Sequence, residues 1–122
     1  MAGAILSSLI RRGDIWLVNL DPTIGSEIKK VRPCVVISSD AVGILPVKLV
    51  APVTAWDDRY RNNLWHVRVD PAAPNGLSKP SAIDALQVRA VDTARMVRCL
   101  GKVTTLVLTA IVEAVATVIE AP

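Results

Sequence analysis

The sequence predicts a mainly β fold (α+β) in which short antiparallel strands form a small barrel and one helix follows them. Apolar runs rich in Val and Ile are separated by Pro, Gly and Asp, a pattern typical of strands joined by turns. Only the stretch after Thr104 carries apolar residues at helical spacing. With 122 residues, 52% of them hydrophobic, the chain is long enough for one core and too short for two.

Six segments are predicted as strands by their β-branched content and by the turn residues beside them. They cover residues 15–20, 34–37, 47–53, 64–69, 82–86 and 87–91. Asp92 is placed to cap a short helix after the sixth strand, and Gly101 is expected to end the segment that follows. The last helix is expected to begin after Thr104 and to turn one apolar stripe toward the sheet. That stripe consists of Leu108, Ile111, Val112, Val115 and Ile119. Five or more short strands with one terminal helix indicate an SH3-like barrel.

We expect residues 1–12 to form a loose N-terminal extension and residues 13–122 to form a single domain. Residues 1–10 are apolar, but the positive charges follow this run instead of preceding it, which is atypical of a signal peptide. Residues 103–119 are also apolar, but Glu113 and several Thr interrupt them. We therefore expect a soluble, cytoplasmic protein that does not enter a membrane.

The charge and the scarcity of His and Cys limit the possible chemistry. Fourteen Lys and Arg against 11 Asp and Glu give a net charge of +3, which permits an anionic partner without requiring one. His66 is the only histidine, and Cys34 and Cys99 are isolated, so no metal site built from His and Cys is expected. Cys34 lies in an apolar run and is expected to act as a small core residue. No cofactor is predicted.

A charged loop is predicted between the first two strands. Asp21-Pro22 ends the first strand because Pro lacks a donor, and Gly25-Ser26 allows the loop to turn. Loops held by rigid strands are the usual place for binding or catalytic groups. The charged residues of this loop are Glu27, Lys29, Lys30 and Arg32.

Several short motifs follow one another at separations that are more specific together than any one of them alone. They are Gly13-Asp14-Ile15, Asp21-Pro22, Gly25-Ser26-Glu27, Arg32-Pro33, Ala51-Pro52-Val53-Thr54 and Gln87-Val88-Arg89-Ala90-Val91-Asp92. This ordered set resembles the MazF/PemK ribonuclease toxins over about residues 12 to 119. The chain departs from the commoner family pattern at residues 28–31, where Ile, Lys, Lys and Val replace Gln and small residues.

The resemblance implies an SH3-like barrel of the MazF/PemK/CcdB kind that forms a homodimer with an RNA groove across both subunits. It also implies a metal-independent, sequence-specific endoribonuclease that cuts single-stranded mRNA. Attack by the 2′-hydroxyl would leave a 2′,3′-cyclic phosphate and a 5′-hydroxyl end and would inhibit translation and growth. The implied protein partner is a cognate MazE-like antitoxin, acidic and partly disordered.

The resemblance also places catalysis at Arg32 and Thr54. Arg32 offers a fixed charge and several donors for phosphate oxygens, and Thr54 adds a hydroxyl donor. Glu27 is expected to help or to act as the base. The expected RNA-binding residues are Ser26, Lys29, Lys30, Arg59 and Gln87.

Residues 55–63 mix aromatic and basic side chains, which suits base stacking and phosphate contacts. In the alternative interpretation, Trp56 or Tyr60 folds back over the edge of the core. His66 follows, and the alternation of residues 64–69 places it on the polar face of a strand, where we expect no catalytic role.

A function from another class is also possible on the same barrel. CcdB-like gyrase inhibitors are not enzymes and act through a terminal helix on a protein target. Their pattern relies on a C-terminal tryptophan, and residues 119–122 contain none. The presence of Arg32 and Thr54 favours the endoribonuclease.

Overall fold

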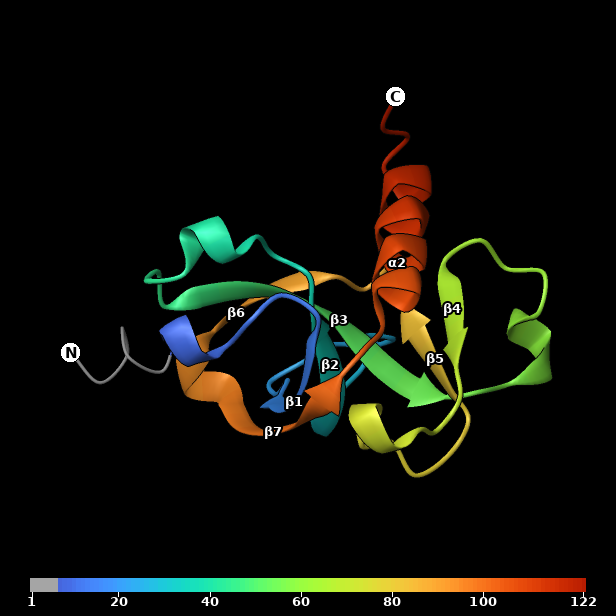
Figure 1. Cartoon of the computed structure of the whole chain (residues 1–122). Coiled ribbons are helices and arrows are strands. Elements are labelled where there is room, and N and C mark those ends of the chain that lie inside the picture. Colours follow the sequence, from blue (N-terminus) through green and yellow to red (C-terminus); the bar gives the residue numbers. More distant parts are fainter. Residues whose placement is uncertain (1–6) are drawn as a thin grey trace.

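The computed structural model describes residues 7–122 and confirms the predicted fold class. In this part of the chain, seven strands pair antiparallel in the order β4-β5-β3-β2-β1-β7, and β6 pairs with β3. The strands are β1 (Asp14–Asn19), β2 (Val31–Val36), β3 (Val47–Ala55), β4 (His66–Val69), β5 (Ser81–Asp84), β6 (Arg89–Asp92) and β7 (Met96–Lys102). One helix, α2 (Thr105–Val118), follows β7 and stands beside β4 and β5 (Figure 1).

Strand β3 is the centre of the sheet. Strand β2 pairs with one edge of β3. Along the other edge of β3, β6 and then β5 pair in succession. Residues 85–88 lie between β5 and β6 and belong to neither ladder, so they bulge out of an otherwise continuous edge. This bulge carries Gln87.

Two apolar clusters form the core. The first contains Val18, Leu20 and Cys34, and the second lies under α2 and contains Ile15, Ile83 and Ile111. Cys34 is fully buried as expected, and loss of hydration raises the pKa of its thiol to about 12.

Helix α2 begins as predicted, because the Thr104 hydroxyl accepts a hydrogen bond from the Val107 amide at 3.2 Å. Its buried stripe differs from the prediction. Ile111 and Ala114 are buried, whereas Val112 and Ile119 are exposed. No helix within residues 7–122 is long and apolar enough to cross a bilayer.

Strand β7 is the main element that the sequence prediction missed. Its burial pattern does not alternate, and two register shifts interrupt its pairing with β1, so no period of two is visible in the sequence. Gly101 lies inside β7 and does not end the segment. Upstream of it, the helical turn η4 (Thr93–Arg95) is capped by Asp92 as predicted.

Two further segments differ from expectation. Residues 62–65 form turns, so the predicted strand 64–69 is shortened to β4. The expected loose extension covers residues 1–12, of which 1–6 lie outside the described residues. Ser7 and Ile10 are buried, and Ile10 belongs to the first core cluster. The packed part of the protein therefore begins before Gly13.

Candidate active site

The pairing of β2 with β3 ends at two prolines, close to the two expected catalytic residues. The β2–β3 ladder pairs Cys34 with Pro52 and does not continue beyond this pair. Neither Pro33 nor Pro52 has an amide hydrogen, so this part of the ladder lacks donors. Beyond this pair, β2 carries Arg32 and β3 carries Thr54, and both residues line one cavity of about 390 Å³.

Arg32 is half-buried in β2 and is oriented by the loop that precedes it. Its Nε donates a hydrogen bond to the Lys29 carbonyl oxygen at 3.2 Å. No acidic partner of Arg32 exists within residues 7–122. Its terminal nitrogens are therefore available to an anion.

Thr54 is half-buried in β3, next to the strand end. Its hydroxyl donates to the Ala55 carbonyl oxygen only at 3.5 Å, the limit of a hydrogen bond. The hydroxyl can therefore exchange this weak contact for a phosphate oxygen.

The cavity of Arg32 and Thr54 is basic. Lys79 and Arg98 also line it, and no Asp or Glu is among its lining residues. Several positive charges in one hollow attract a polyanion, and neighbouring low-dielectric walls strengthen the effect. We call this cavity the basic cavity. The polar side chains that matter for its chemistry are Arg32, Thr54, Lys79 and Arg98.

Sequence reasoning missed Lys79 and Arg98. Arg98 belongs to β7, which pairs with β1 so that Arg98 lies opposite Leu17. Lys79 lies in the turn-rich segment before β5, beside Gly76. Gly76 has a left-handed φ of 66°, and a Cβ there would lie 2.2 Å from the Leu100 carbonyl oxygen. Only glycine therefore lets this turn pack on β7 and complete the wall.

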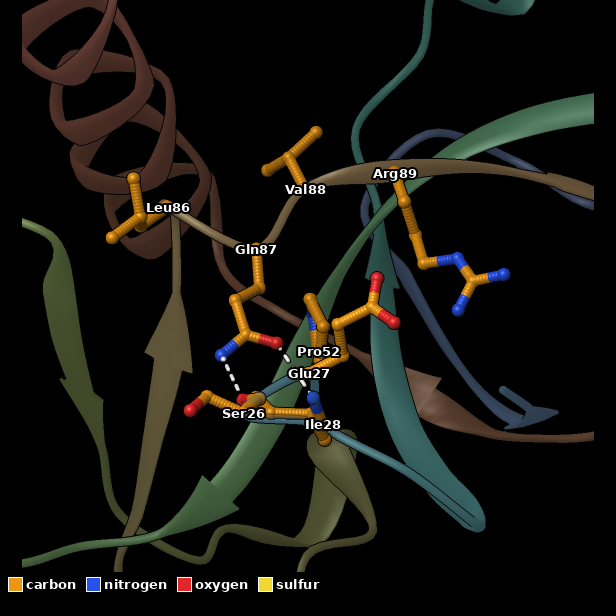
Figure 2. Close-up of a pocket in the computed structure, with 8 residues that line it drawn as sticks. All are labelled: Ser26, Glu27, Ile28, Pro52, Leu86, Gln87, Val88 and Arg89. Carbon is orange, nitrogen blue, oxygen red and sulfur yellow. Dashed lines mark hydrogen bonds between the residues drawn. The ribbon is translucent and has the colours of Figure 1, made fainter. Parts of the chain in front are cut away.

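A second cavity of about 540 Å³ lies between the β1–β2 loop and the bulge of residues 85–88. It brings together Ser26, Glu27 and Gln87, three of the predicted site residues (Figure 2). The Gln87 carboxamide is bound to the loop backbone, where it accepts from the Ile28 amide at 2.7 Å and donates to the Ser26 carbonyl at 3.3 Å. The predicted residues thus divide between two cavities.

Glu27 is exposed on the loop and does not line the basic cavity. Its Oε1 accepts a hydrogen bond from the Ile24 amide at 2.5 Å. The carboxylate therefore stabilises the turn of its own loop. Its second oxygen has no hydrogen-bond partner within the described part of the chain.

Lys29 and Lys30 are both exposed on the same loop. The Lys30 backbone fixes the end of the loop before β2. Its amide donates to Asp21 Oδ1 at 3.1 Å, and its carbonyl accepts from the Leu20 amide. Lys30 adopts a left-handed φ of 71°, which is uncommon for a residue with a side chain. Their ammonium groups are free to contact phosphates.

Arg59 lies in a different environment. It belongs to η2 (Asp58–Tyr60), and its guanidinium donates to both carboxylate oxygens of Asp57 at 2.8 to 3.1 Å. These hydrogen bonds lower the pKa of Asp57 and raise that of Arg59. Of the two interpretations of the aromatic residues, inward folding fits Tyr60, which stacks on His66 with ring centroids 3.8 Å apart.

His66 is not on a polar surface, contrary to the sequence prediction. Its side chain is only 9% exposed, its Nε2 lies 3.5 Å from Asp84 Oδ2, and its Nδ1 is buried without a partner among the described residues. Neither cavity includes it among its lining residues. A ring packed between Tyr60 and Asp84 serves the structure of this end of the sheet.

No group of three His, Cys, Asp or Glu side chains that could hold a metal ion exists within residues 7–122. The chemistry that this geometry can perform is the binding of a phosphodiester by Arg and Lys charges together with the Thr54 hydroxyl.

The chain is similar to known toxins over most of its length. The family model described as PemK-like, MazF-like toxin of type II toxin-antitoxin systems matches residues 11–119. Endoribonuclease MazF9 of Mycobacterium tuberculosis is 35% identical over 101 residues, which cover 78% of this chain and 83% of that protein.

Solved structures show the same fold. MazF from Deinococcus radiodurans superposes with a TM-score of 0.75 at 23% identity, covering 90% of this chain and 96% of that one. An endoribonuclease from a mycobacterial species, solved in complex with its cognate antitoxin, gives a TM-score of 0.72 at 18% identity and covers 92% and 96% of the two chains.

Proposed function

Because the chain belongs to the PemK-like, MazF-like toxin family of type II toxin-antitoxin systems, we propose that it is an endoribonuclease toxin. Its proposed substrate is single-stranded mRNA, and cleavage would inhibit translation and growth. The basic cavity is the observation that carries this proposal, since Arg32 and Thr54 line it together with Lys79 and Arg98 and without a carboxylate. An RNA phosphate fits such a set of donors and charges.

In the proposed reaction, the 2′-oxygen of RNA attacks the adjacent phosphorus as its proton leaves. The new bond joins phosphorus to the 2′-oxygen, the bond to the 5′-oxygen breaks, and that oxygen takes a proton. The products are a 2′,3′-cyclic phosphate and a 5′-hydroxyl end. The nucleophile is part of the substrate, so the chemistry needs neither a metal-bound water nor a cofactor.

Arg32 is the proposed stabiliser of the charge that builds up on the non-bridging oxygens. Its Nε is bound to the Lys29 carbonyl, so the guanidinium is held before the substrate arrives. Thr54 is the proposed second donor to the same phosphate. A guanidinium carries several N–H donors and no acceptor atom, so Arg32 is assigned as a charge and a proton donor, not as the base.

Glu27 is the proposed acceptor of the 2′-proton, or a helper in this step. It lies on the loop that precedes β2, five residues before Arg32, and its side chain is exposed. The bound RNA would have to bring its 2′-hydroxyl to this loop. Ser26, Lys29 and Lys30 on the loop would hold the flanking phosphates, whereas Arg59 is bound by Asp57 and is assigned no phosphate.

Two protein partners belong to the proposal. One is a second copy of the chain, for which the exposed Val112 and Ile119 on and after α2 offer apolar surface. The other is a cognate antitoxin, because the related mycobacterial endoribonuclease is solved with one. An acidic, partly disordered segment would neutralise the basic cavity. With mRNA as its substrate, the toxin would act in the cytoplasm.

The test uses purified protein and a short RNA in EDTA, with the cut ends mapped by sequencing. We expect cleavage to persist with chelator and to leave a cyclic phosphate. A matched RNA with a single 2′-deoxynucleotide at the mapped cut site should stay intact. Cleavage of the deoxy substrate, or activity that returns only with Mg²⁺, would contradict the internal attack.

The CcdB-like alternative gains no support from these observations. The curated relative is named an endoribonuclease, and Arg32 and Thr54 lie together at one cavity. Inhibition of DNA gyrase by the protein, without any RNA cleavage, would reverse this preference.

A further inference from the structure

We propose that Gln87 is a positioning residue, which holds the β1–β2 loop so that the loop backbone orients Arg32. This inference deepens the proposed function and rests on it for the role of Arg32. It also replaces the expectation from the sequence that Gln87 contacts RNA. Gln87 lies in the bulge between β5 and β6, and Arg32 lies in β2 across the sheet.

The Gln87 side chain bridges two points of the loop backbone. Its Oε1 accepts from the Ile28 amide at 2.7 Å, and its Nε2 donates to the Ser26 carbonyl at 3.3 Å (Figure 2). Both polar ends of the carboxamide are therefore engaged with main-chain groups about sixty residues away. Such a bridge fixes the loop at residues 26–28 relative to the sheet.

The loop is also held from Ile28 onward. The Ile28 side chain packs against the first core cluster. The next residue, Lys29, offers its carbonyl to Arg32 Nε at 3.2 Å. Gln87 binds the Ile28 amide, and Arg32 binds the carbonyl of Lys29, the next residue. One peptide unit joins these two residues. A shift of this peptide moves the guanidinium with it.

The bulge itself is rigid enough to serve as an anchor. Asp84 Oδ1 accepts from the amides of Leu86 and Gln87 at 2.9 and 3.2 Å. The Asp84 side chain is 8% exposed, and its other oxygen faces His66. Gln87 is therefore presented to the loop by a carboxylate that is buried in the sheet.

Ile28 is held in two ways. Its side chain packs on the first core cluster, and its amide is bound by Gln87. The segment between Ile28 and Arg32 is thereby fixed by side chain and backbone together. We therefore expect a loop whose return to β2 is well ordered without RNA.

Three variants test this role. Gln87→Met keeps the length of the side chain and removes both hydrogen bonds. Gln87→Glu keeps an acceptor for the Ile28 amide and loses the donor to Ser26. Ile24→Ala is the matched control, because Ile24 lies on the same loop with a side chain that is 84% exposed. Melting curves show whether each variant is folded.

The first measurement is hydrogen exchange at the Ile28 amide, which needs no RNA and no activity. Loss of the bond should speed exchange roughly tenfold in Gln87→Met, since net hydrogen-bond contributions are of this order. Gln87→Glu should keep the amide protected, and Ile24→Ala should behave as the wild type. Unchanged exchange in Gln87→Met would overturn the proposal, as would a loss of protection in the control.

The second measurement separates kcat from RNA binding. With the loop displaced, kcat should fall about tenfold in Gln87→Met, because small errors in position cost this much or more. The KM, and the Kd for the uncleavable deoxy RNA, should change less than about twofold. Gln87→Glu should recover most of kcat. A weaker Kd with unchanged kcat and unchanged Ile28 exchange would identify Gln87 as an RNA contact and overturn the proposal.

The outcomes also distinguish this inference from the proposed function. Normal cleavage by Arg32→Ala would refute the proposed active site while the exchange result at Ile28 still reports on the loop. Loss of cleavage in Arg32→Ala with normal kcat in Gln87→Met would leave the proposed function intact and refute the role of Gln87.

Discussion

The basic cavity and the β3–β4 loop (residues 56–65) both contain arginines, but only the arginines of the loop are paired with carboxylates. Arg32, Lys79 and Arg98 share a hollow that no carboxylate lines. In the β3–β4 loop, Arg59 is bound by Asp57 and Arg61 lies 3.5 Å from Asp58. The sequence predicted that Arg32 and Arg59 both act on RNA, but within the described residues only Arg32 lacks an acidic partner.

The pairing of the charges, and not their number, distinguishes the two regions. An arginine that already donates two hydrogen bonds to a carboxylate must give them up before it can bind a phosphate. Arg98, which has no such partner within the described residues, can bind without this cost. The experiments below test this difference, from the largest expected effect to the smallest.

Arg32→Ala should reduce the cleavage rate about a hundredfold to a thousandfold, as loss of one preorganised donor typically does. Arg32→Lys should recover only a small part, because an ammonium keeps the charge and loses the planar fork. Single-turnover kinetics on one short RNA measure both. Near-normal cleavage by Arg32→Ala, in a protein that melts normally, would place the active centre elsewhere.

Thr54→Ala should slow cleavage about tenfold to a hundredfold, less than Arg32→Ala, because it removes one neutral donor. Thr54→Ser is the control and should keep most of the activity, since the hydroxyl remains. The same kinetics apply. Equal losses in both variants would mean that the methyl group, and not the hydroxyl, is required.

Arg98→Ala and Arg59→Ala compare the two regions directly. Arg98→Ala should weaken binding of uncleavable RNA severalfold and should lower the slope of log Kd against log salt by about one, as expected for one lost phosphate contact. Arg59→Ala should leave both nearly unchanged. Titrations at several salt concentrations decide the matter. A larger effect from Arg59 would show that Asp57 yields its partner to RNA.

His66→Ala should lower the free energy of unfolding by about 2 kcal/mol, because it removes a buried ring that stacks on Tyr60. Cleavage measured well below the melting temperature should change little. The control is Leu64→Ala, which removes an exposed side chain nearby. A collapse of cleavage without a change in stability would give His66 a role in the reaction.

The two cysteines should differ in alkylation of the folded protein. Cys99 is exposed and should react, whereas Cys34 is buried with a pKa of about 12 and should be protected. Mass spectrometry after mild alkylation measures the reactivity.

The buried neutral thiol of Cys34 also makes the free energy of unfolding depend on pH. In the unfolded chain the thiol ionises near 9.0, so this contribution is complete below pH 9 and is lost as the pH rises toward 12.

The sequence predicted the elements whose patterns are local. The first and third strands, the Asp92 cap and the Thr104 cap follow from neighbouring residues, and the structure confirms them. The second strand was predicted to begin at Cys34, but β2 begins at Val31, so Arg32 lies in the strand and not on the loop. Strand β7 could not be predicted, because bulges break its period of two and its partner β1 is distant in sequence. The contributions of Arg98 and Lys79 to the basic cavity depend on that partnership.

The site residues show the same division. The motifs predicted that Arg32 and Thr54 act together, and the ends of two adjacent strands bring both residues to one cavity, while their catalytic role stays a prediction. Arg59 and Gln87 were assigned by composition and motif alone. Their actual partners, Asp57 and the loop backbone, depend on side-chain orientation that no spacing rule contains. The environment of His66 was missed for the same reason, since Tyr60 covers it from a turn.

The pairing of β1 with β7 has a consequence for biosynthesis. Leu17 lies opposite Arg98, so this contact closes a loop of about eighty residues, and such distant contacts form late because their closure entropy must be offset by other contacts. On the ribosome, Leu17, Arg32 and Thr54 are made long before Arg98 and Leu100. The cavity therefore lacks one wall until most of the chain has been translated. The residues that line the basic cavity are therefore all present only after Leu100 has been synthesised.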